Sequence, residues 1–386
     1  MTPAGHTHLA LPAAHPRRPG TGTGAAVAGL GVLGLGAVGA VGATVGAAAL
    51  PLATVLALVP LLVVLLAIRW VDRWEPEPWA ALAVAFAWGA GVSVLAALVL
   101  NTGTMLILLA TGSPEADATA WGAAVVAPLV EEGIKGAGVL MVFLVWRRFF
   151  DGPVDGVVYA AVVAAGFAFV ENILYFGTAV AQGEEMGDAG TAVVTVFVLR
   201  AVLSPFAHVT FTVCVGLALG LVAHRRGTWV WAFPLGLAGA VLLHALWNGS
   251  AVLGGGSAFL VVYLVTQVPL FALLIGLVVW LRRQEGRVLA HHLAGYGDQG
   301  WFSPAEVRML AHLGERRRAR AWAAGLGGRP ARTAMRAFQE AATALALQRH
   351  RAASSRAGLR AQHEEGVLLG HVEATRVQLA HVLPGR

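Results

Sequence analysis

The chain has 386 residues, of which 57% are hydrophobic and only 12% are charged, with a formal net charge of +6. Soluble domains carry about 25% charged residues, so this composition excludes an ordinary water-soluble protein. The single cysteine, Cys214, excludes a disulfide framework and a cysteine metal site. The sequence is that of an integral membrane protein with the lipid bilayer as its main partner, and nothing in it indicates a nucleic-acid partner.

Apolar runs dominate the chain from its N-terminal region to about residue 283. Residues 1–24 are expected to form a cytoplasmic tail. Most of the runs that follow approach the roughly 20 residues that a helix needs to cross a bilayer. Pro205 is expected to kink the sixth, which is long. About eight spans are predicted over residues 25–283, at 25–48, 51–68, 79–101, 121–146, 156–180, 191–223, 228–253 and 257–281.

The arginines between these spans predict the topology. No Arg or Lys lies in the connections after spans one, three, five and seven. Because basic residues concentrate on the cytoplasmic side, this alternation predicts an even number of spans with both termini in the cytoplasm. The fold class expected is an all-α, polytopic transmembrane helical bundle. The basic pairs lie before the first span and after the second, fourth and sixth, at Arg17 and Arg18, Arg69 and Arg73, Arg147 and Arg148, and Arg225 and Arg226.

Residues 284–386 are basic and are expected to form a partly helical cytoplasmic tail. The run Ser303-Pro304-Ala305-Glu306 is a capping box with proline at the first helical position, and a second helical stretch is predicted over 333–353. The tail is either a docking or regulatory segment against anionic lipid, or a soluble tail with ordinary cytoplasmic charge. Three tryptophans near the third span are interpreted as an aromatic interface belt, namely Trp70, Trp74 and Trp79.

Few ionisable side chains interrupt the spans, and each is a functional hypothesis because a charge at mid-bilayer costs several kcal/mol. At about 1.5 Å of rise per residue, those of spans four to seven converge on one level near the midplane. Four helices that deliver polar groups to one depth indicate a site. The polar set comprises Glu131, Glu132, Lys135, Glu171, Asn172, Arg200, His208, His244 and Asn248.

The spacing within this set supports a shared site. Lys135, the only lysine of the chain, lies four residues after Glu131 and three after Glu132, so it can neutralise either carboxylate on one helical face. His244 and Asn248 are also four residues apart. Arg200 is expected to have a structural role, as the partner of a carboxylate.

The residue types point to hydrolysis of an amide bond without a covalent intermediate. A desolvated glutamate can act as general base on a water molecule. Neutral histidines can hold that water, bind a metal or protonate a leaving amine, and His and Asn donors can stabilise an oxyanion. The sequence contains neither a Gly-x-Ser-x-Gly motif nor a His-Glu-x-x-His motif that would indicate another hydrolase.

An ordered series of motifs resembles the PrsW family of bacterial intramembrane proteases, which is related to the CAAX prenyl endopeptidases. The resemblance covers about residues 69–250. Where the CAAX enzymes have Phe-x-x-x-His, this chain has Phe167-x-x-x-Glu171, which fits PrsW and argues against prenyl-protein processing. The series is Glu75-Pro76-Glu77-Pro78, Glu131-Glu132-Gly133-Ile134-Lys135, Phe167-Ala168-Phe169-Val170-Glu171-Asn172, His208, and His244-Ala245-Leu246-Trp247-Asn248.

The resemblance implies roles for these residues. Glu131 is the water-activating carboxylate, with Glu132 as its partner and Lys135 as the balancing charge. His208, His244 and Asn248 correspond to groups that hold the water and the oxyanion. The family has been described both as metalloproteases and as glutamic proteases, and the two types stay open here. In the metal alternative, His208, His244 and Glu171 would bind Zn²⁺.

The function expected is an endopeptidase of the bacterial plasma membrane that cuts a membrane-anchored protein. By resemblance, the substrate could be an anti-sigma factor in a stress-signalling cascade. The alternative from another class is a proton- or cation-coupled transporter, because buried Glu, Lys and His also form proton relays. Two similar halves with broken helices, which are typical of transporters, are not visible in the sequence.

Overall fold

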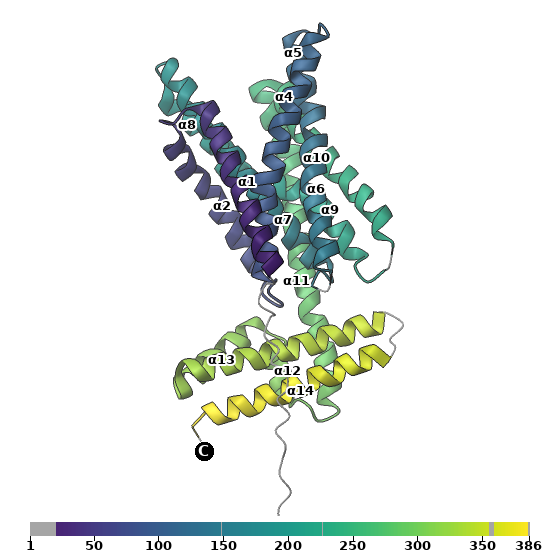
Figure 1. Cartoon of the computed structure of the whole chain (residues 1–386). Helices are drawn as coiled ribbons and strands as arrows, with labels where there is room; N and C mark the ends of the chain where they lie inside the picture. Colours follow the sequence, from purple (N-terminus) through teal and green to yellow (C-terminus); the bar gives the residue numbers. More distant parts are fainter. Residues whose placement is uncertain (1–20, 148, 226, 355–358, 385–386) are drawn as a thin grey trace, which may run out of the picture.

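A computed structural model describes residues 21–147, 149–225, 227–354 and 359–384, with the side chains of 21–23, 253–258, 354, 359 and 360 left out. The expected tail over 1–24 lies almost wholly outside these residues, as do Arg17, Arg18, Arg148 and Arg226. The described chain is a bundle of long helices above a smaller bundle near the C-terminus (Figure 1). The orientation of the termini relative to the membrane stays a prediction.

The larger bundle is built from α-helices that are interrupted in places by short π-helices, labelled η. Helices satisfy every backbone polar group within the segment, which lipid requires. In chain order the elements are α1 (Thr21–Val45), α2 (Leu50–Val71), α3 (Trp79–Ala87), η1 (Trp88–Ser93), α4 (Val94–Ala110), α5 (Glu115–Trp121), η2 (Gly122–Val126), α6 (Ala127–Val145), α7 (Pro153–Glu185), α8 (Ala189–Phe197), η3 (Val198–Leu203), α9 (Ala207–Leu221), α10 (Trp229–Val262), η4 (Tyr263–Gln267) and α11 (Val268–Gly297).

The predicted polytopic all-α bundle is confirmed. Among the described residues, seven helical stretches are long and apolar enough to cross a membrane. They correspond to all the predicted spans except the fourth. That span is formed by α5, η2 and α6, and it is set apart by the three charged residues Glu131, Glu132 and Lys135.

The third and sixth predicted spans can be compared with the helices of the structure. The third span was predicted to end at residue 101, which is wrong, because the helix continues through α4 to Ala110. A polar residue in this extension is satisfied inside the helix, because Thr104 Oγ1 donates to the carbonyl oxygen of Leu100, 2.8 Å away. The expected kink at Pro205 is present, because η3 ends at Leu203 and α9 begins at Ala207.

The chain reverses direction within the range of α10, between Trp247 and Phe259. Their ring centroids lie 5.8 Å apart, and the Trp247 and Tyr263 rings 6.2 Å apart. Twelve residues of straight helix would separate Trp247 from Phe259 by about 18 Å. The two predicted spans 228–253 and 257–281 are therefore separate passes.

Helix α7 forms the centre of the larger bundle and is buried along most of its length. It packs closely against α9 through small residues. A Cβ atom added to Gly156 would lie 2.0 Å from the carbonyl oxygen of Gly216, so the two backbones touch there. Small residues permit such contacts between membrane helices. This contact sets the position of α7 relative to α9, and so of Glu171 relative to His208.

Residues 284–384 form a second bundle, here called the C-terminal bundle. It contains the end of α11 and the helices α12 (Pro304–Leu310), α13 (Leu313–Ser354) and α14 (Leu359–Val382). The expected capping box is present, with Ser303 and Glu306 bonding to each other's backbone N–H. Helix α13 turns back on itself at Gly327 and Gly328, where the φ of +64° at Gly328 suits glycine.

Trp74 connects the two bundles. It follows α2, is 8% exposed, and packs in the core of the C-terminal bundle with Leu289, Leu293 and Phe338. The interpretation of Trp74 as part of an interface belt was therefore wrong. Trp70 and Trp79, by contrast, are 37% and 64% exposed.

Candidate active site

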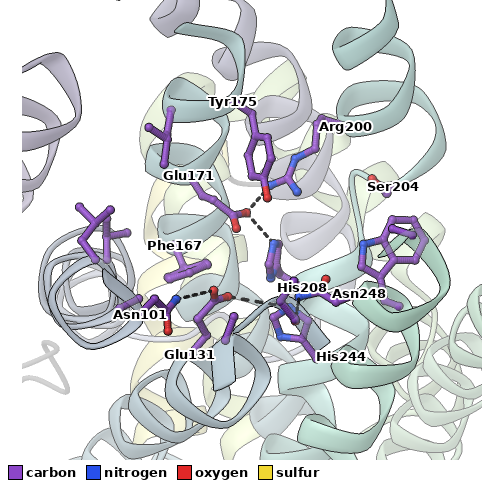
Figure 2. A pocket seen from close by; sticks show the side chains of 18 of the residues that line it. Asn101, Glu131, Phe167, Glu171, Tyr175, Arg200, Ser204, His208, His244 and Asn248 are labelled. Carbon is purple, nitrogen blue, oxygen red and sulfur yellow. Dashed lines mark hydrogen bonds and ion pairs between the residues drawn. The ribbon is translucent and has the colours of Figure 1, made fainter. Parts of the chain in front are cut away.

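A cavity of about 470 Å³ lies among α4, α6, α7, η3, α9 and α10. It gathers polar side chains from helices that are far apart in the sequence (Figure 2). Glu132 and Lys135 lie behind its wall and have no exposed surface. The lining includes six residues that were proposed from the sequence: Glu131, Glu171, Arg200, His208, His244 and Asn248.

Glu132 is fully engaged by three partners. Its Oε1 atom lies 2.5 Å from Lys135 Nζ and 2.9 Å from His244 Nδ1, and its Oε2 accepts a hydrogen bond of 2.8 Å from Thr212. Because an ionised carboxylate only accepts, Nδ1 of His244 carries the proton of that bond. Glu132 therefore holds Lys135 and orients His244, and it is not among the residues that line the cavity.

Glu131 has the opposite environment. It is 6% exposed and lies on the cavity wall, where Asn101 of α4 approaches Oε1 at 3.5 Å. Its Oε2 is buried and has no hydrogen-bond partner among the described residues. The nearest cationic or imidazole groups to Oε2 are His244 Nε2 at 3.9 Å and Lys135 Nζ at 4.0 Å. An unpartnered buried carboxylate oxygen indicates that a water, proton or ion belongs there.

His208 bridges two charged groups. Lys135 Nζ lies 3.2 Å from its Nδ1, and Glu171 Oε2 lies 2.8 Å from its Nε2. A lysine ammonium can only donate, so Nδ1 accepts and Nε2 carries the proton that Glu171 accepts. Phe167 packs edge-on against the same imidazole ring, with centroids 5.3 Å apart. His208 is thereby held in one tautomer.

Glu171 belongs to an ion pair on α7. Its Oε2 is bonded to Arg200 of η3 as well as to His208. The Nε of Arg200 donates to Asn172 Oδ1 over 2.7 Å, and its guanidinium lies 4.2 Å from the centre of the Tyr175 ring. The expectation that Arg200 pairs with a carboxylate agrees with this arrangement. Glu171 is thus less free than Glu131 to bind another group.

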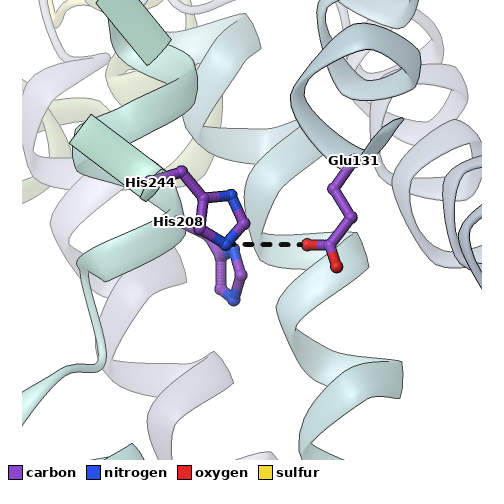
Figure 3. Close-up of side chains that lie close together, drawn as sticks. All are labelled: Glu131, His208 and His244. Carbon is purple, nitrogen blue, oxygen red and sulfur yellow. Dashed lines mark ion pairs between the residues drawn. The ribbon is translucent and has the colours of Figure 1, made fainter. Parts of the chain in front are cut away.

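Three side chains offer donor atoms that could hold a metal ion. One atom each of Glu131, His208 and His244 lies within 4.8 Å of the others (Figure 3). The set differs from the expected one, because Glu131 takes the place of Glu171. His244 suits the role, since a carboxylate on Nδ1 is the usual support of a histidine that binds metal through Nε2. His208 would have to release Lys135 or Glu171.

The charge of the cluster also suits a cation. Glu131, Glu132 and Glu171 face the two cations Lys135 and Arg200, which leaves one negative charge when all are ionised. A buried unbalanced charge is costly. A proton on Glu131 or a bound cation would reduce it, and the residues present fit a zinc ion with an open coordination position.

Asn248 lies at the edge of the site. Its Nδ2 donates to the carbonyl oxygen of Ala123 in η2, 2.8 Å away. A π-helix leaves backbone carbonyls displaced from the regular pattern, and π-helices are frequent at functional sites. The bond ties α10 to the segment that leads into Glu131. The structure thus gives Asn248 a role in positioning the start of α6.

Two contributing residues were not predicted. Asn101 was placed at the end of a span, although an amide in an apolar stretch is itself a signal of an internal partner. Thr212 carries no such signal, because threonine in a membrane helix commonly bonds its own backbone. Only the fold shows that Thr212 of α9 faces Glu132 of α6.

The fold and the site define a class: a multi-pass helical membrane protein with a carboxylate–histidine site buried within its bundle. Comparison with known proteins identifies the family. The model of the family described as "PrsW family intramembrane metalloprotease" matches residues 77–274, about half of the chain. The chain belongs to this family, and the matched region contains every polar residue that lines the cavity.

Two curated relatives are similar to this chain. Protease PrsW of Clostridioides difficile (strain 630) is 34% identical over 149 residues, which cover 39% of this chain and 57% of the relative. Protease PrsW of Geobacillus kaustophilus (strain HTA426) is 36% identical over 109 residues, which cover 28% of this chain and 42% of the relative. The chain thus spans about half the length of the curated relatives it matches. No solved structure matches it.

Proposed function

We propose that this protein is an endopeptidase of the bacterial plasma membrane that hydrolyses a peptide bond of a membrane-anchored protein. The observation that carries the proposal is the unpartnered Oε2 of Glu131, which lies 3.9 Å from Nε2 of His244 on the wall of a cavity. One water molecule can contact both atoms at this separation. The family to which the chain belongs and its two protease relatives support the same activity.

In the proposed reaction, Glu131 accepts a proton from the water as the water oxygen bonds to the substrate carbonyl carbon. The C–N bond then breaks, and the proton passes from Glu131 to the leaving amine. His244 holds the water through Nε2, because Glu132 fixes its tautomer. Lys135 keeps His208 and Glu132 in place and lowers the cost of three carboxylates in one site.

A zinc ion fits the same residues. Glu131, His208 and His244 would hold it, and when bound it supplies a Lewis acid for the carbonyl group and acidifies a bound water. Hydrolysis requires the peptide carbonyl of the substrate to reach Glu131. The substrate would therefore enter the cavity as an extended strand that has left its helix. An anti-sigma factor with one membrane span falls in this substrate class.

The test is cleavage of a panel of tagged single-span proteins by the purified protein in lipid. We expect the wild type to produce a defined fragment and Glu131→Gln and His244→Ala to lose it. The matched control is Glu184→Gln, which removes an exposed carboxylate from the last turn of α7. Equal cleavage by Glu131→Gln would exclude the proposed base. Absence of cleavage by a folded wild type, together with proton uptake in vesicles, would favour the transporter alternative.

A further inference from the structure

A second cavity, of about 780 Å³, lies where the larger bundle meets the C-terminal bundle. Its upper wall comes from the ends of α2 and α3 and the connection between them. Its lower wall comes from the two arms of α13, which run antiparallel: Arg316 bonds Thr343, and Arg320 Nη1 donates to Gln339 Oε1 over 2.7 Å. Figure 1 shows α13 lying below the lower end of α2.

The cavity carries a large excess of positive charge. Seven arginines and two carboxylates line it. The carboxylates are Asp72 and Glu340, and the arginines are Arg69, Arg73, Arg316, Arg317, Arg320, Arg332 and Arg336. Only Arg336 forms an ion pair among the described residues, with Glu340 at 2.7 Å. The other six guanidinium groups have no carboxylate within ion-pair distance in the described part of the chain.

Arg316 shows the cost of this arrangement. It is 4% exposed, its Nε donates to the carbonyl oxygen of Leu310 over 2.8 Å, and it lies 5.1 Å from the centre of the Trp74 ring. Burial and the nearby Arg320 lower the pKa of Arg316 to about 10. A buried guanidinium that has only neutral partners is destabilising, and an anion would relieve it.

The two carboxylates do little to compensate. Glu340 already forms an ion pair with Arg336. Burial raises the pKa of Asp72 to about 7, so its negative charge is incomplete at neutral pH. Both Asp72 oxygens also face the backbone N–H of Glu77 at 3.2 Å. The described residues of this cavity therefore supply little negative charge to balance its arginines, and Arg316 is the one that is buried.

The upper wall shows which kind of anion fits. It contains apolar side chains of membrane spans, among them Leu65, Ile68, Leu82 and Phe86. These lie at the ends of α2 and α3 that adjoin Arg69 and Arg73, on the side that the arginine distribution predicts to be cytoplasmic. A ligand that satisfies both walls has phosphate groups for the arginines and acyl chains for the apolar surface. Guanidinium groups recognise phosphate through paired hydrogen bonds.

We propose that this junction cavity is a binding site for the headgroup of an anionic phospholipid from the adjacent leaflet. The lipid supplies the negative charge between the two bundles, with its acyl chains along α2 and α3. Juxtamembrane arginines contribute to binding of anionic lipid in general, and here two protein elements present them to one cavity. The site is separate from the candidate active site, so its occupancy can be measured without an activity assay.

The experiment is native mass spectrometry of the full-length protein in detergent. The probes are dioleoyl phosphatidylglycerol, dioleoyl phosphatidylcholine with the same chains, and glycerol phosphate with the same headgroup and no chains. The test variant is Arg320→Gln with Arg332→Gln. The control is Arg225→Gln with Arg329→Gln, which removes the same charge from two exposed positions outside the cavity. We expect the test variant to bind phosphatidylglycerol roughly tenfold or more weakly, and the control to bind as the wild type does.

The other outcomes overturn the proposal. Unchanged phosphatidylglycerol binding by the test variant would exclude the cavity. Equal binding of phosphatidylcholine would exclude recognition of the anionic headgroup. Displacement of the lipid by equal concentrations of glycerol phosphate would assign the cavity to a soluble anion. If the double variant does not fold, Arg332→Gln alone serves, because Arg332 is exposed.

Discussion

The Nδ1 atom of His244 lies 2.9 Å from Oε1 of Glu132, and this bond decides which face of the imidazole is available. The carboxylate takes the N–H, so the lone pair of Nε2 points towards Glu131. The adjacent carboxylates of one helix thus have different surroundings. Glu132 is saturated by Lys135, His244 and Thr212, whereas Oε2 of Glu131 has no hydrogen-bond partner in the described part of the chain.

Glu131→Gln should abolish cleavage and leave the fold intact. The amide keeps the shape of the side chain but cannot accept the proton of a water, which we expect to lower the rate roughly 10²- to 10⁴-fold. Because no strong bond of Glu131 is lost, thermal stability should stay near the wild-type value. Cleavage and unfolding should be measured on the same preparation. A large loss of stability would instead show that Glu131 is structural.

Glu132→Gln should destabilise the protein, because it leaves Lys135 buried without its closest counterion. Removing one partner of a buried pair costs about 3–5 kcal/mol. The double variant Glu132→Gln with Lys135→Met should recover part of the loss, since neither charge remains. A double-mutant cycle of unfolding free energies in detergent measures this coupling. Strictly additive losses would mean that the two side chains do not stabilise each other.

Metal content separates the two catalytic types without an activity assay. If the site holds zinc, the purified wild type should contain about one zinc ion per chain, and Glu131→Gln and His244→Ala should contain much less. Glu132→Gln should weaken zinc binding about 10- to 100-fold, because it removes the support of His244. Elemental analysis of chelator-free preparations gives the ratio. Zinc content that is equal in all variants would show that the metal lies elsewhere.

Gly156→Ala should destabilise the bundle, and Gly103→Ala should not. A Cβ at position 156 would lie 2.0 Å from the carbonyl oxygen of Gly216, so α7 and α9 would have to separate. At Gly103 of α4, no heavy atom lies within 4 Å of the added Cβ. Both exchanges raise the helix propensity by the same amount. A difference in the thermal unfolding of the two variants therefore measures the effect of the close contact alone. Equal stability of the two would contradict the close contact.

Stability should fall as the pH rises through the titration of Glu77, which lies in the connection between α2 and α3. Burial raises the pKa of Glu77 from 4.5 to about 8. The hydrogen bond of 2.5 Å that Tyr159 donates to Glu77 lowers this pKa, but by less than burial raises it. The folded protein therefore binds this proton more tightly than the unfolded chain does. Its stabilising effect is complete below about pH 4.5 and is lost as the pH approaches 8.

The control for this pH dependence is Glu77→Gln. A glutamine stays neutral and can still accept the hydrogen bond of Tyr159. Its unfolding midpoint should therefore vary less with pH than that of the wild type between about pH 5 and 8. Parallel curves for the two proteins would assign the pH dependence to another group.

The ionic members of the site were predictable because lipid makes each charge conspicuous. Glu131, Lys135 and Glu171 stand out against apolar neighbours, and a helical rise of 1.5 Å per residue brings them to one depth. The different hydrogen bonding of Glu131 and Glu132 was not predictable. It depends on Thr212 of another helix, whose rotation about its axis the spacing of residues does not fix.

The C-terminal region shows the same limit at the level of the fold. The capping box at Ser303 follows from local chemistry and is present. The turn of α13 at Gly327 and Gly328 and the burial of Trp74 depend on contacts between distant segments. An abundance of arginine suggested a tail with ordinary positive charge, whereas the fold gathers several of these arginines around one cavity.

The break at Pro205 divides one membrane crossing into two pieces that no continuous backbone ladder joins. Arg200 lies before the break and His208 after it, and both bind the same oxygen of Glu171. The Glu171 carboxylate on α7 thus connects the two pieces of the neighbouring crossing through its bonds to Arg200 and His208. Removing the Glu171 carboxylate would therefore remove a side chain that bonds both pieces of this crossing.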